Sequence, residues 1–124
     1  MTNRDVMALS FAALEVRDLQ ASKSFYENVL GFEASPAMRP DAVIMKTDEN
    51  GASFAIKRIT PASEGATRLG AGVAIWFRCL NVDDLEARVN EAGGTVILAA
   101  QEGPFGRMVV VLDPDGHALT FHNA

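Results

Sequence analysis

Short apolar runs and two amphipathic segments alternate along the chain, and they predict strands and helices. The first run, residues 7–16, is followed over 18–29 by apolar positions that recur at helical spacing. Proline and an Asp-Glu-Asn-Gly turn then separate three β-rich runs, which predict strands over residues 32–35, 42–47 and 52–59. The first half therefore has the order strand, helix, three strands.

The second half repeats this order after a glycine-rich loop over about residues 61–72. We predict a strand over 73–80, a helix that begins at 81–84 and ends at Gly93, and strands over 95–100, 107–112 and 118–122. Similar short motifs, Val-Arg-Asp-Leu and Val-Asp-Asp-Leu, lead into the two helices, which favours an internal duplication. An α+β domain with two unrelated strand–helix starts explains the pattern equally well.

Each predicted helix has its own boundary signals and one apolar face. Asp18 is placed to cap the first helix and Gly31 to end it. The predicted apolar faces consist of Ala21, Phe25, Val29 and Leu30 in the first helix and of Leu85, Val89 and Ala92 in the second.

Composition narrows the class of protein. With 124 residues the chain makes one domain, residues 1–124, with a first module over about 6–60 and a second over about 73–124. The net charge of -5 without a Lys/Arg cluster argues against a nucleic-acid partner. No apolar run is long enough to span a membrane, and no signal peptide is evident. The chain has a single cysteine, Cys79, so it forms no intrachain disulfide. Together these features predict a cytoplasmic protein.

Three stretches carry a resemblance to a known family. They are residues 14–32 with Phe-Tyr and Leu-Gly-Phe, residues 76–94, and residues 105–117 with Phe-Gly-Arg and Asp-Pro-Asp-Gly. The chain resembles the vicinal oxygen chelate superfamily, which includes glyoxalase I, bleomycin resistance proteins and extradiol dioxygenases. The resemblance implies an α+β fold of two βαβββ modules that form a cupped mixed sheet. It also implies a homodimer whose cups face a small-molecule ligand.

The metal-using members of that family place ligands at four positions. Carried over to this sequence, those positions hold Phe11, a residue near Ala55, Ala74 and Thr120. Phenylalanine and alanine cannot ligate a divalent ion, and a lone threonine is a poor ligand. We therefore expect no metal and no cofactor. One alternative stays open, a site built from His122 and Glu15.

Strand alternation predicts which side chains face the cup. The predicted ligand-binding residues are Phe11, Glu15, Ala55, Lys57, Ala74, Trp76, Arg78, Phe105, Arg107, Thr120 and His122. Together they form a pocket with an apolar centre, aromatic walls and a polar rim, which suits a planar, partly apolar molecule. Trp76 either stacks on that ligand or fills the core or a dimer interface. Phe11 either contacts the ligand or plugs the cavity.

Several polar candidates have two interpretations each. Arg107, on a predicted loop with Phe105, binds a ligand carboxylate or pairs at the surface with Glu102 or Asp113. Glu15 is a general base or an ion-pair partner of Lys57 or Arg78. For the remaining groups we expect that Cys79 is a small buried hydrophobe, that Tyr26 packs and that His117 is exposed.

The function that these observations favour is metal-independent binding and sequestration of a planar aromatic or antibiotic-like small molecule by a dimer. Sequestration needs no chemistry, which agrees with a site without a convincing nucleophile–base pair. The alternative is a glyoxalase-type lyase, isomerase or dioxygenase with an atypical site. A third possibility is an accessory subunit that uses only its dimer surface.

Overall fold

The first module is built from residues in the first half of the chain. A computed structural model describes residues 9–36, 39–47, 52–61, 63–66 and 69–123. The module consists of β1 (Phe11–Val16), α1 (Leu19–Ser24), the π-helical turn η1 (Phe25–Leu30), β2 (Glu33–Ala34), β3 (Ala42–Lys46) and β4 (Ser53–Arg58). The predicted order of strand, helix and three strands is confirmed, although β2 is shorter than expected.

The second module has the same order. It consists of β5 (Ile75–Arg78), α2 (Val82–Glu91), β6 (Thr95–Gly103), β7 (Gly106–Leu112) and β8 (Ala118–His122). Three details differ from the prediction. The strand β5 is shorter than residues 73–80, β6 continues beyond residue 100 to Gly103, and Gly106 and Arg107, expected on a loop with Phe105, belong to β7. The reason for the last two differences is a tight hairpin in which Gly103 pairs with Gly106.

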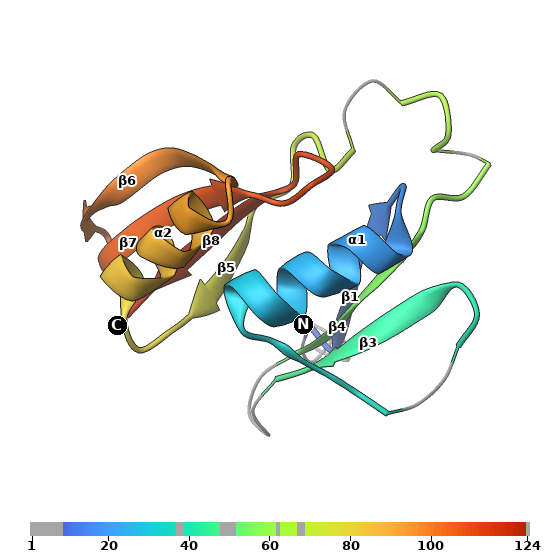
Figure 1. Cartoon of the computed structure of the whole chain (residues 1–124), viewed down its shortest axis with the longest axis horizontal. Helices are drawn as coiled ribbons and strands as arrows, with labels where there is room; N and C mark the ends of the chain where they lie inside the picture. The colour runs from blue at the N-terminus through green and yellow to red at the C-terminus, as the bar shows by residue number, and fades with distance from the viewer. Residues whose placement is uncertain (1–8, 37–38, 48–51, 62, 67–68, 124) are drawn as a thin grey trace, which may run out of the picture.

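The two sheets share one topology, with orders β1-β4-β3-β2 and β5-β8-β7-β6. In each sheet the first strand runs parallel to the last and the other pairs are antiparallel. Each helix crosses one face of its own sheet (Figure 1). The predicted α+β fold of two βαβββ modules with mixed sheets is therefore confirmed. None of the described helices has the length and hydropathy needed to span a bilayer.

The first helix begins and ends where the sequence predicts. The Asp18 side chain accepts a hydrogen bond from the Ala21 N–H at 3.0 Å, and Gly31 ends the helix with φ = 91°. Its buried face, however, is formed by Leu19, Ser22, Tyr26 and Leu30, and Ala21 is exposed. The buried positions Ser22, Tyr26 and Leu30 keep the predicted spacing of four, but they lie one residue further along the chain than Ala21, Phe25 and Val29.

The second helix follows its pattern more closely. The Asn81 side chain caps it by accepting from the Asp84 N–H at 3.0 Å, and Leu85 and Val89 are buried together with Val82. Ala92, expected on the same face, is exposed because it is the C-cap residue beyond the last helical turn.

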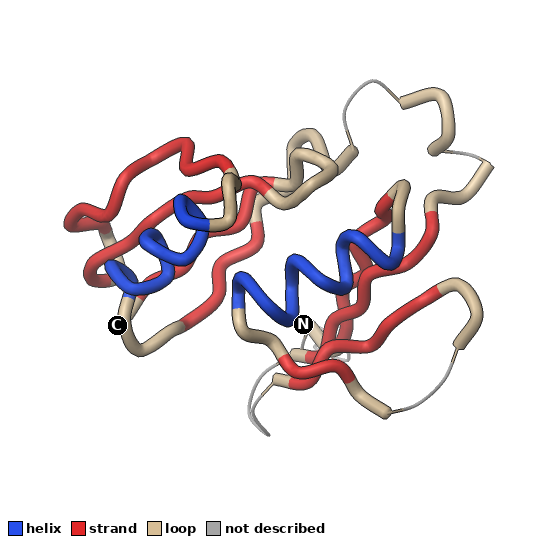
Figure 2. The backbone as a smooth tube through the Cα atoms, in the orientation of Figure 1, coloured by secondary structure: helices blue, strands red, loops and turns tan. Residues whose placement is uncertain are grey.

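An aromatic cluster joins the cores of the two modules. The Phe32 ring lies 5.0 Å from the Phe54 ring of the same module and 5.0 Å from the Phe77 ring of the other. Phe77 also stacks on Phe121 at 5.3 Å. The modules, which lie beside each other in Figure 2, thus share one hydrophobic core rather than two.

Polar contacts fasten the Asp-Pro-Asp-Gly turn of the second module to the first module. The Tyr26 hydroxyl, fully buried, donates to Asp113 Oδ2 at 2.9 Å. The His117 Nε2–H donates to the Glu15 main-chain oxygen at 2.7 Å. Tyr26 packs as expected, but the prediction that His117 is exposed is wrong, since its side chain lies under the connection between the modules with 5% exposure.

This packing predicts different costs for two nearby glycines. Gly70 (φ = 72°) and Gly72 (φ = 85°) both have left-handed backbones, but a Cβ on Gly70 would overlap His117 Nδ1 and one on Gly72 meets open space. We expect Gly72→Ala to lower the free energy of unfolding by about 1 kcal/mol through backbone strain. Gly70→Ala should lower it by about 2 kcal/mol because overpacking adds to the strain. Urea unfolding measures both, and equal losses would show that His117 is not held as described.

Candidate functional site

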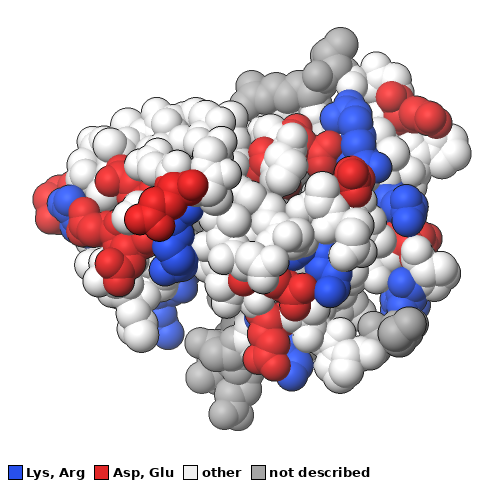
Figure 3. Space-filling model, in the orientation of Figure 1, with Lys and Arg blue, Asp and Glu red and all other residues white. Residues whose placement is uncertain are grey.

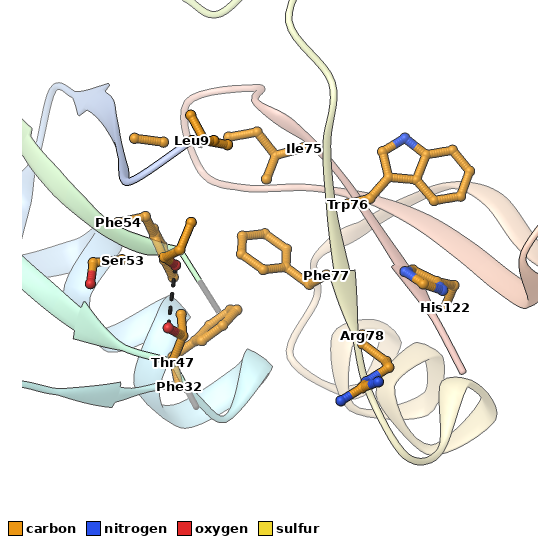
Figure 4. A pocket seen from close by; sticks show the side chains of 12 residues that line it. Leu9, Phe32, Thr47, Ser53, Phe54, Ile75, Trp76, Phe77, Arg78 and His122 are labelled. Atoms are coloured by element: carbon orange, nitrogen blue, oxygen red, sulfur yellow. Dashed lines mark hydrogen bonds between the residues drawn. The ribbon is translucent and has the colours of Figure 1, made fainter. Parts of the chain in front are cut away.

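A pocket of about 630 Å³ opens between the two modules. Apolar and aromatic side chains from both modules form most of its wall, and a few polar groups complete it (Figure 4). The lining residues are Leu9, Ala12, Phe32, Thr47, Ala52, Ser53, Phe54, Ile75, Trp76, Phe77, Arg78 and His122. Its size and its apolar character suit a small organic ligand.

The strand β5 divides the pocket into two parts. Alternate side chains of a strand point to opposite faces, and accordingly Phe77 points toward Phe54 of the first module (Figure 4). Trp76 lies on the other side of the strand together with His122. One part is therefore the outer end of the shared core, and the other is an exposed aromatic surface.

Three rings form that exposed surface, which we call the aromatic cluster of Trp76, Phe105 and His122. Trp76 meets Phe105 edge to face at 5.6 Å and His122 at 5.8 Å between ring centroids. The His122 Nδ1–H donates to the Phe105 carbonyl oxygen at 3.2 Å, since a carbonyl can only accept. Trp76 remains 39% exposed and Phe105 59% exposed. The rings thus hold one another in place while their outer faces stay open to a ligand.

The structure brings only part of the predicted site together. Trp76, Arg78 and His122 line the pocket, and Phe105 adjoins it through the aromatic cluster. The strand registers pair residues that the prediction placed on one face: Trp76 with Thr120, Arg78 with His122, and Glu15 with Lys57.

The remaining predicted residues lie away from this pocket. Phe11 is 48% exposed on the face of β1 that points away from the helix, and Ala74 is exposed just before β5. Ala55 and Thr120 are buried, and Lys57 is half-buried. Within one chain these side chains belong to the outer faces of two separate sheets.

The segment that connects the two modules donates hydrogen bonds to the side chain of Glu15. Its carboxylate accepts hydrogen bonds from the Thr60 N–H at 3.0 Å and from the Ser63 hydroxyl. The hydrogen bond from Ser63, followed by that from Thr60, lowers the pKa of Glu15. The charge of Lys57, the expected ion-pair partner that lies opposite Glu15 in the ladder, contributes less to this lowering than the two hydrogen bonds do. A carboxylate held in this way is a poor general base.

Arg107 forms an ion pair that the sequence did not suggest. Its Nε donates to Asp83 Oδ2 at 2.8 Å and its Nη2 to Asp83 Oδ1 at 2.9 Å, a bidentate arrangement. The hydrogen bonds from Arg107 lower the pKa of Asp83. The expected partner Glu102 lies opposite Arg107 in the ladder instead. Arg107 therefore supports the start of α2 and does not line the pocket.

Cys79 behaves as a partly buried hydrophobe. It packs against the hydrophobic core, and burial raises the pKa of its thiol. A raised pKa disfavours the thiolate, which is the nucleophilic form. The expectation of a structural role agrees with this environment.

The sequence did not predict the pocket-lining residues of the first module or those on the core-facing side of β5. Phe32, Phe54 and Phe77 line the pocket although strand alternation placed Phe54 and Phe77 on the core side of their sheets. Phe32 directly follows the first predicted helix and Phe77 shortly precedes the second, so two of these aromatic residues stood at recognisable positions in the sequence. The missing information was how the two modules sit against each other, which a period of two within one strand does not contain.

The four positions that hold metal in related proteins do not fit a metal here. They carry Phe11, a residue near Ala55, Ala74 and Thr120, and among these four named residues only the threonine has a side-chain oxygen. Within the described part of the chain, no group of three or more His, Cys, Asp or Glu side chains is arranged to hold a metal ion.

Comparison with known sequences identifies the family. A profile of the Glyoxalase/Bleomycin resistance protein/Dioxygenase superfamily matches residues 8–121. The chain therefore belongs to this superfamily. No curated protein matches the sequence significantly.

Solved structures with the same fold have names of different kinds. A glyoxalase/bleomycin resistance protein/dioxygenase family enzyme from Burkholderia phytofirmans PsJN shares 23% identity, with a TM-score of 0.76 over 94% of this chain and 98% of that one. TnmS3, an antibiotic binding protein from Streptomyces sp. CB03234, shares 21% identity, with a TM-score of 0.73 over 98% of each chain. A lactoylglutathione lyase from Agrobacterium tumefaciens shares 20% identity, with a TM-score of 0.69 over 98% and 96% of the two chains. At these identities the likeness shows the fold alone.

Proposed function

We propose that this protein binds and sequesters a planar aromatic, antibiotic-like small molecule without a metal. The observation that carries the proposal is the aromatic cluster of Trp76, Phe105 and His122, exposed beside an apolar pocket. Flat π-faces held edge to face leave an outer surface on which another flat ring can stack. The shared fold with TnmS3, an antibiotic binding protein, agrees with binding as the function.

We further propose that a second copy of the chain completes the site. The strands β1 and β5 stand at the ends of their sheets, so each has one ladder edge without a partner among the described strands. Phe11 and Trp76 are exposed on the sheet faces that no helix covers. A homodimer that places β1 of one copy beside β5 of the other would join the two sheets at these edges, and the uncovered faces would form the walls of the cup. It would gather the predicted residues Phe11, Glu15, Ala55, Lys57, Ala74, Trp76, Arg78, Thr120 and His122 around one ligand.

The compartment proposed for this activity is the cytoplasm. The chain has a single cysteine, Cys79, and so cannot use the intrachain disulfides common in secreted proteins of this size.

The test is a binding screen on the full chain. Because Trp76 is the single tryptophan, its fluorescence reports on ligands that approach the aromatic cluster. We expect planar polycyclic compounds such as anthraquinones, phenazines and naphthoquinones to quench it and to raise the melting temperature equally with and without divalent metals. A ligand at 100 times its Kd adds about 2.7 kcal/mol of stability. Sedimentation should give twice the chain mass of 13.3 kDa.

Two results would contradict the proposal. The first is the absence of quenching and of thermal stabilisation across the screen. The second is turnover of the hemithioacetal of methylglyoxal and glutathione that depends on an added divalent metal, which would instead favour the lyase alternative. If the protein sedimented as a monomer and still bound the ligand, the dimer proposal would be wrong. The pocket between the two modules of one chain would then be the binding site.

A further inference from the structure

Among the described residues, the charge that lines the pocket is opposite in sign to the net charge of the protein. The chain has 16 acidic residues and a net charge of -5. Nevertheless, no Asp or Glu is among the residues that line the pocket in the described structure, and Arg78 is the one charged residue there. On the face seen in Figure 3, acidic side chains gather over α2 instead. A cationic group at the edge of an apolar pocket favours anionic ligands over cationic ones.

Arg78 stands next to the aromatic cluster. It is two residues from Trp76 on the same strand, so both side chains leave the same side of the backbone. In the ladder it pairs with His122 of β8, and it lies at the end of the pocket below Phe77 in Figure 4. A guanidinium has five N–H donors in one plane, so it can bind a carboxylate with two bonds while keeping other contacts.

We infer that the ligand of this pocket is an aromatic acid, with its ring on Trp76 and its carboxylate on Arg78. The inference rests on the proposed function and specifies its ligand class. A planar aromatic carboxylate matches both features at once. Its ring stacks on the aromatic cluster. Its carboxylate binds the guanidinium of Arg78 at the end of the pocket.

The opposite choice, a cationic ligand, is disfavoured by the same groups. A cation over the Trp76 ring would gain a cation–π contact but would lie close to Arg78. In the proposed dimer the second copy would add Lys57 and Glu15 to the cup. The opposite charges of Glu15 and Lys57 would offset each other in that cup, so Arg78 would leave its balance positive.

The experiment compares three ligands of one shape on the full chain. The ligands are anthraquinone-2-carboxylate, its neutral carboxamide and the cationic 2-(aminomethyl)anthraquinone, each titrated calorimetrically at about 50 mM salt. We expect the carboxylate to bind about tenfold more tightly than the amide, and the cation more weakly than the amide. Charge-assisted bonds of an arginine to a carboxylate are worth roughly this factor at a partly exposed site. Salt should reduce the preference.

Two matched variants assign the preference to Arg78. Arg78→Gln and Arg58→Gln each remove one positive charge, but Arg58 is exposed at the end of β4, outside the pocket lining. Arg78→Gln should abolish the preference for the carboxylate, and Arg58→Gln should retain it. The two variants have the same net charge, so a difference between them is a local effect.

The possible outcomes separate this inference from the proposed function. Equal affinity for all three ligands, tightest binding of the cation, or an unchanged preference in Arg78→Gln would overturn the aromatic-acid inference while leaving aromatic binding intact. Binding of none of the three, in agreement with a failed screen, would overturn the proposed function as well.

Discussion

Replacement of Asp113 by alanine is expected to lower the free energy of unfolding by about 4 kcal/mol. This carboxylate is 5% exposed and accepts three hydrogen bonds. The Tyr26 hydroxyl donates to it at 2.9 Å, the His117 N–H at 2.8 Å and the Asp115 N–H at 2.9 Å. Each buried donor that loses its acceptor costs about 1–3 kcal/mol, and the tight turn loses its internal support.

Urea unfolding measures this loss, and Asp41→Ala is the matched control. Asp41 is exposed just before β3, so its replacement should change stability by no more than about 0.5 kcal/mol. A loss as small as that of the control would show that the turn of the second module does not depend on Asp113. It would also weaken the view that this turn joins the modules.

Asp113→Asn should separate the hydrogen bonds of this group from its charge. Burial raises the pKa of Asp113, mainly by desolvation, even though its hydrogen bonds act in the opposite direction. In the wild type, the unfolded carboxyl therefore ionises at a lower pH than the folded one. As the pH rises through the raised pKa, stability contributed by the protonated group is lost.

Asparagine keeps an acceptor oxygen for the two backbone N–H groups, and its amide can donate to the oxygen of Tyr26. The stability of Asp113→Asn minus that of the wild type should rise from about pH 4 until the pH exceeds the folded pKa, and then level off. Because this difference cancels the titration of all other groups, a flat difference would mean that the pKa of Asp113 is not raised.

Trp76→Ala is expected to weaken binding of a planar aromatic ligand about 100-fold, or about 2.7 kcal/mol. Trp76 contacts both other rings of the aromatic cluster, at 5.6 and 5.8 Å between centroids. Its removal takes away the stacking surface and also loosens Phe105. Calorimetry is the suitable measurement, since the variant has no tryptophan left to report binding.

Trp76→Phe and Ile97→Ala provide the controls for this effect. Phenylalanine keeps a π-face, so Trp76→Phe should lose less than about tenfold in affinity. Ile97 is another exposed apolar residue, 51% accessible on β6 and outside the pocket lining, and its replacement should leave affinity unchanged. Full affinity in Trp76→Ala would exclude the aromatic cluster as the stacking surface.

The elements of the fold were predictable because their signals are local. The cap at Asp18 and the stop at Gly31 each depend on a few neighbouring residues, and both occur as predicted. The second helix begins within the predicted residues 81–84, where the structure shows Asn81 as its cap. These helix ends, together with the apolar runs between turns, predict the repeated βαβββ order. Local signals were weaker for buried faces. A spacing of four is compatible with two adjacent faces of the first helix, and Ala21 lies on the exposed one.

The candidate site was predictable only in part. Strand alternation correctly placed Trp76, Arg78 and His122 near one another, because it is a property of a single strand and its register partner. It did not identify Phe32 or Phe54, which line the pocket from the other module.

By itself, the sequence determined the two modules, their helix boundaries, the residue types at the family's metal positions and the aromatic character of the site. Only the tertiary structure decided that Arg107 pairs with Asp83, that His117 is buried against Glu15 and that Phe32 meets Phe77 across the modules. The physical reason is distance along the chain. Caps and alternation depend on neighbours within a few residues, whereas these contacts join residues far apart that meet only when the modules pack together.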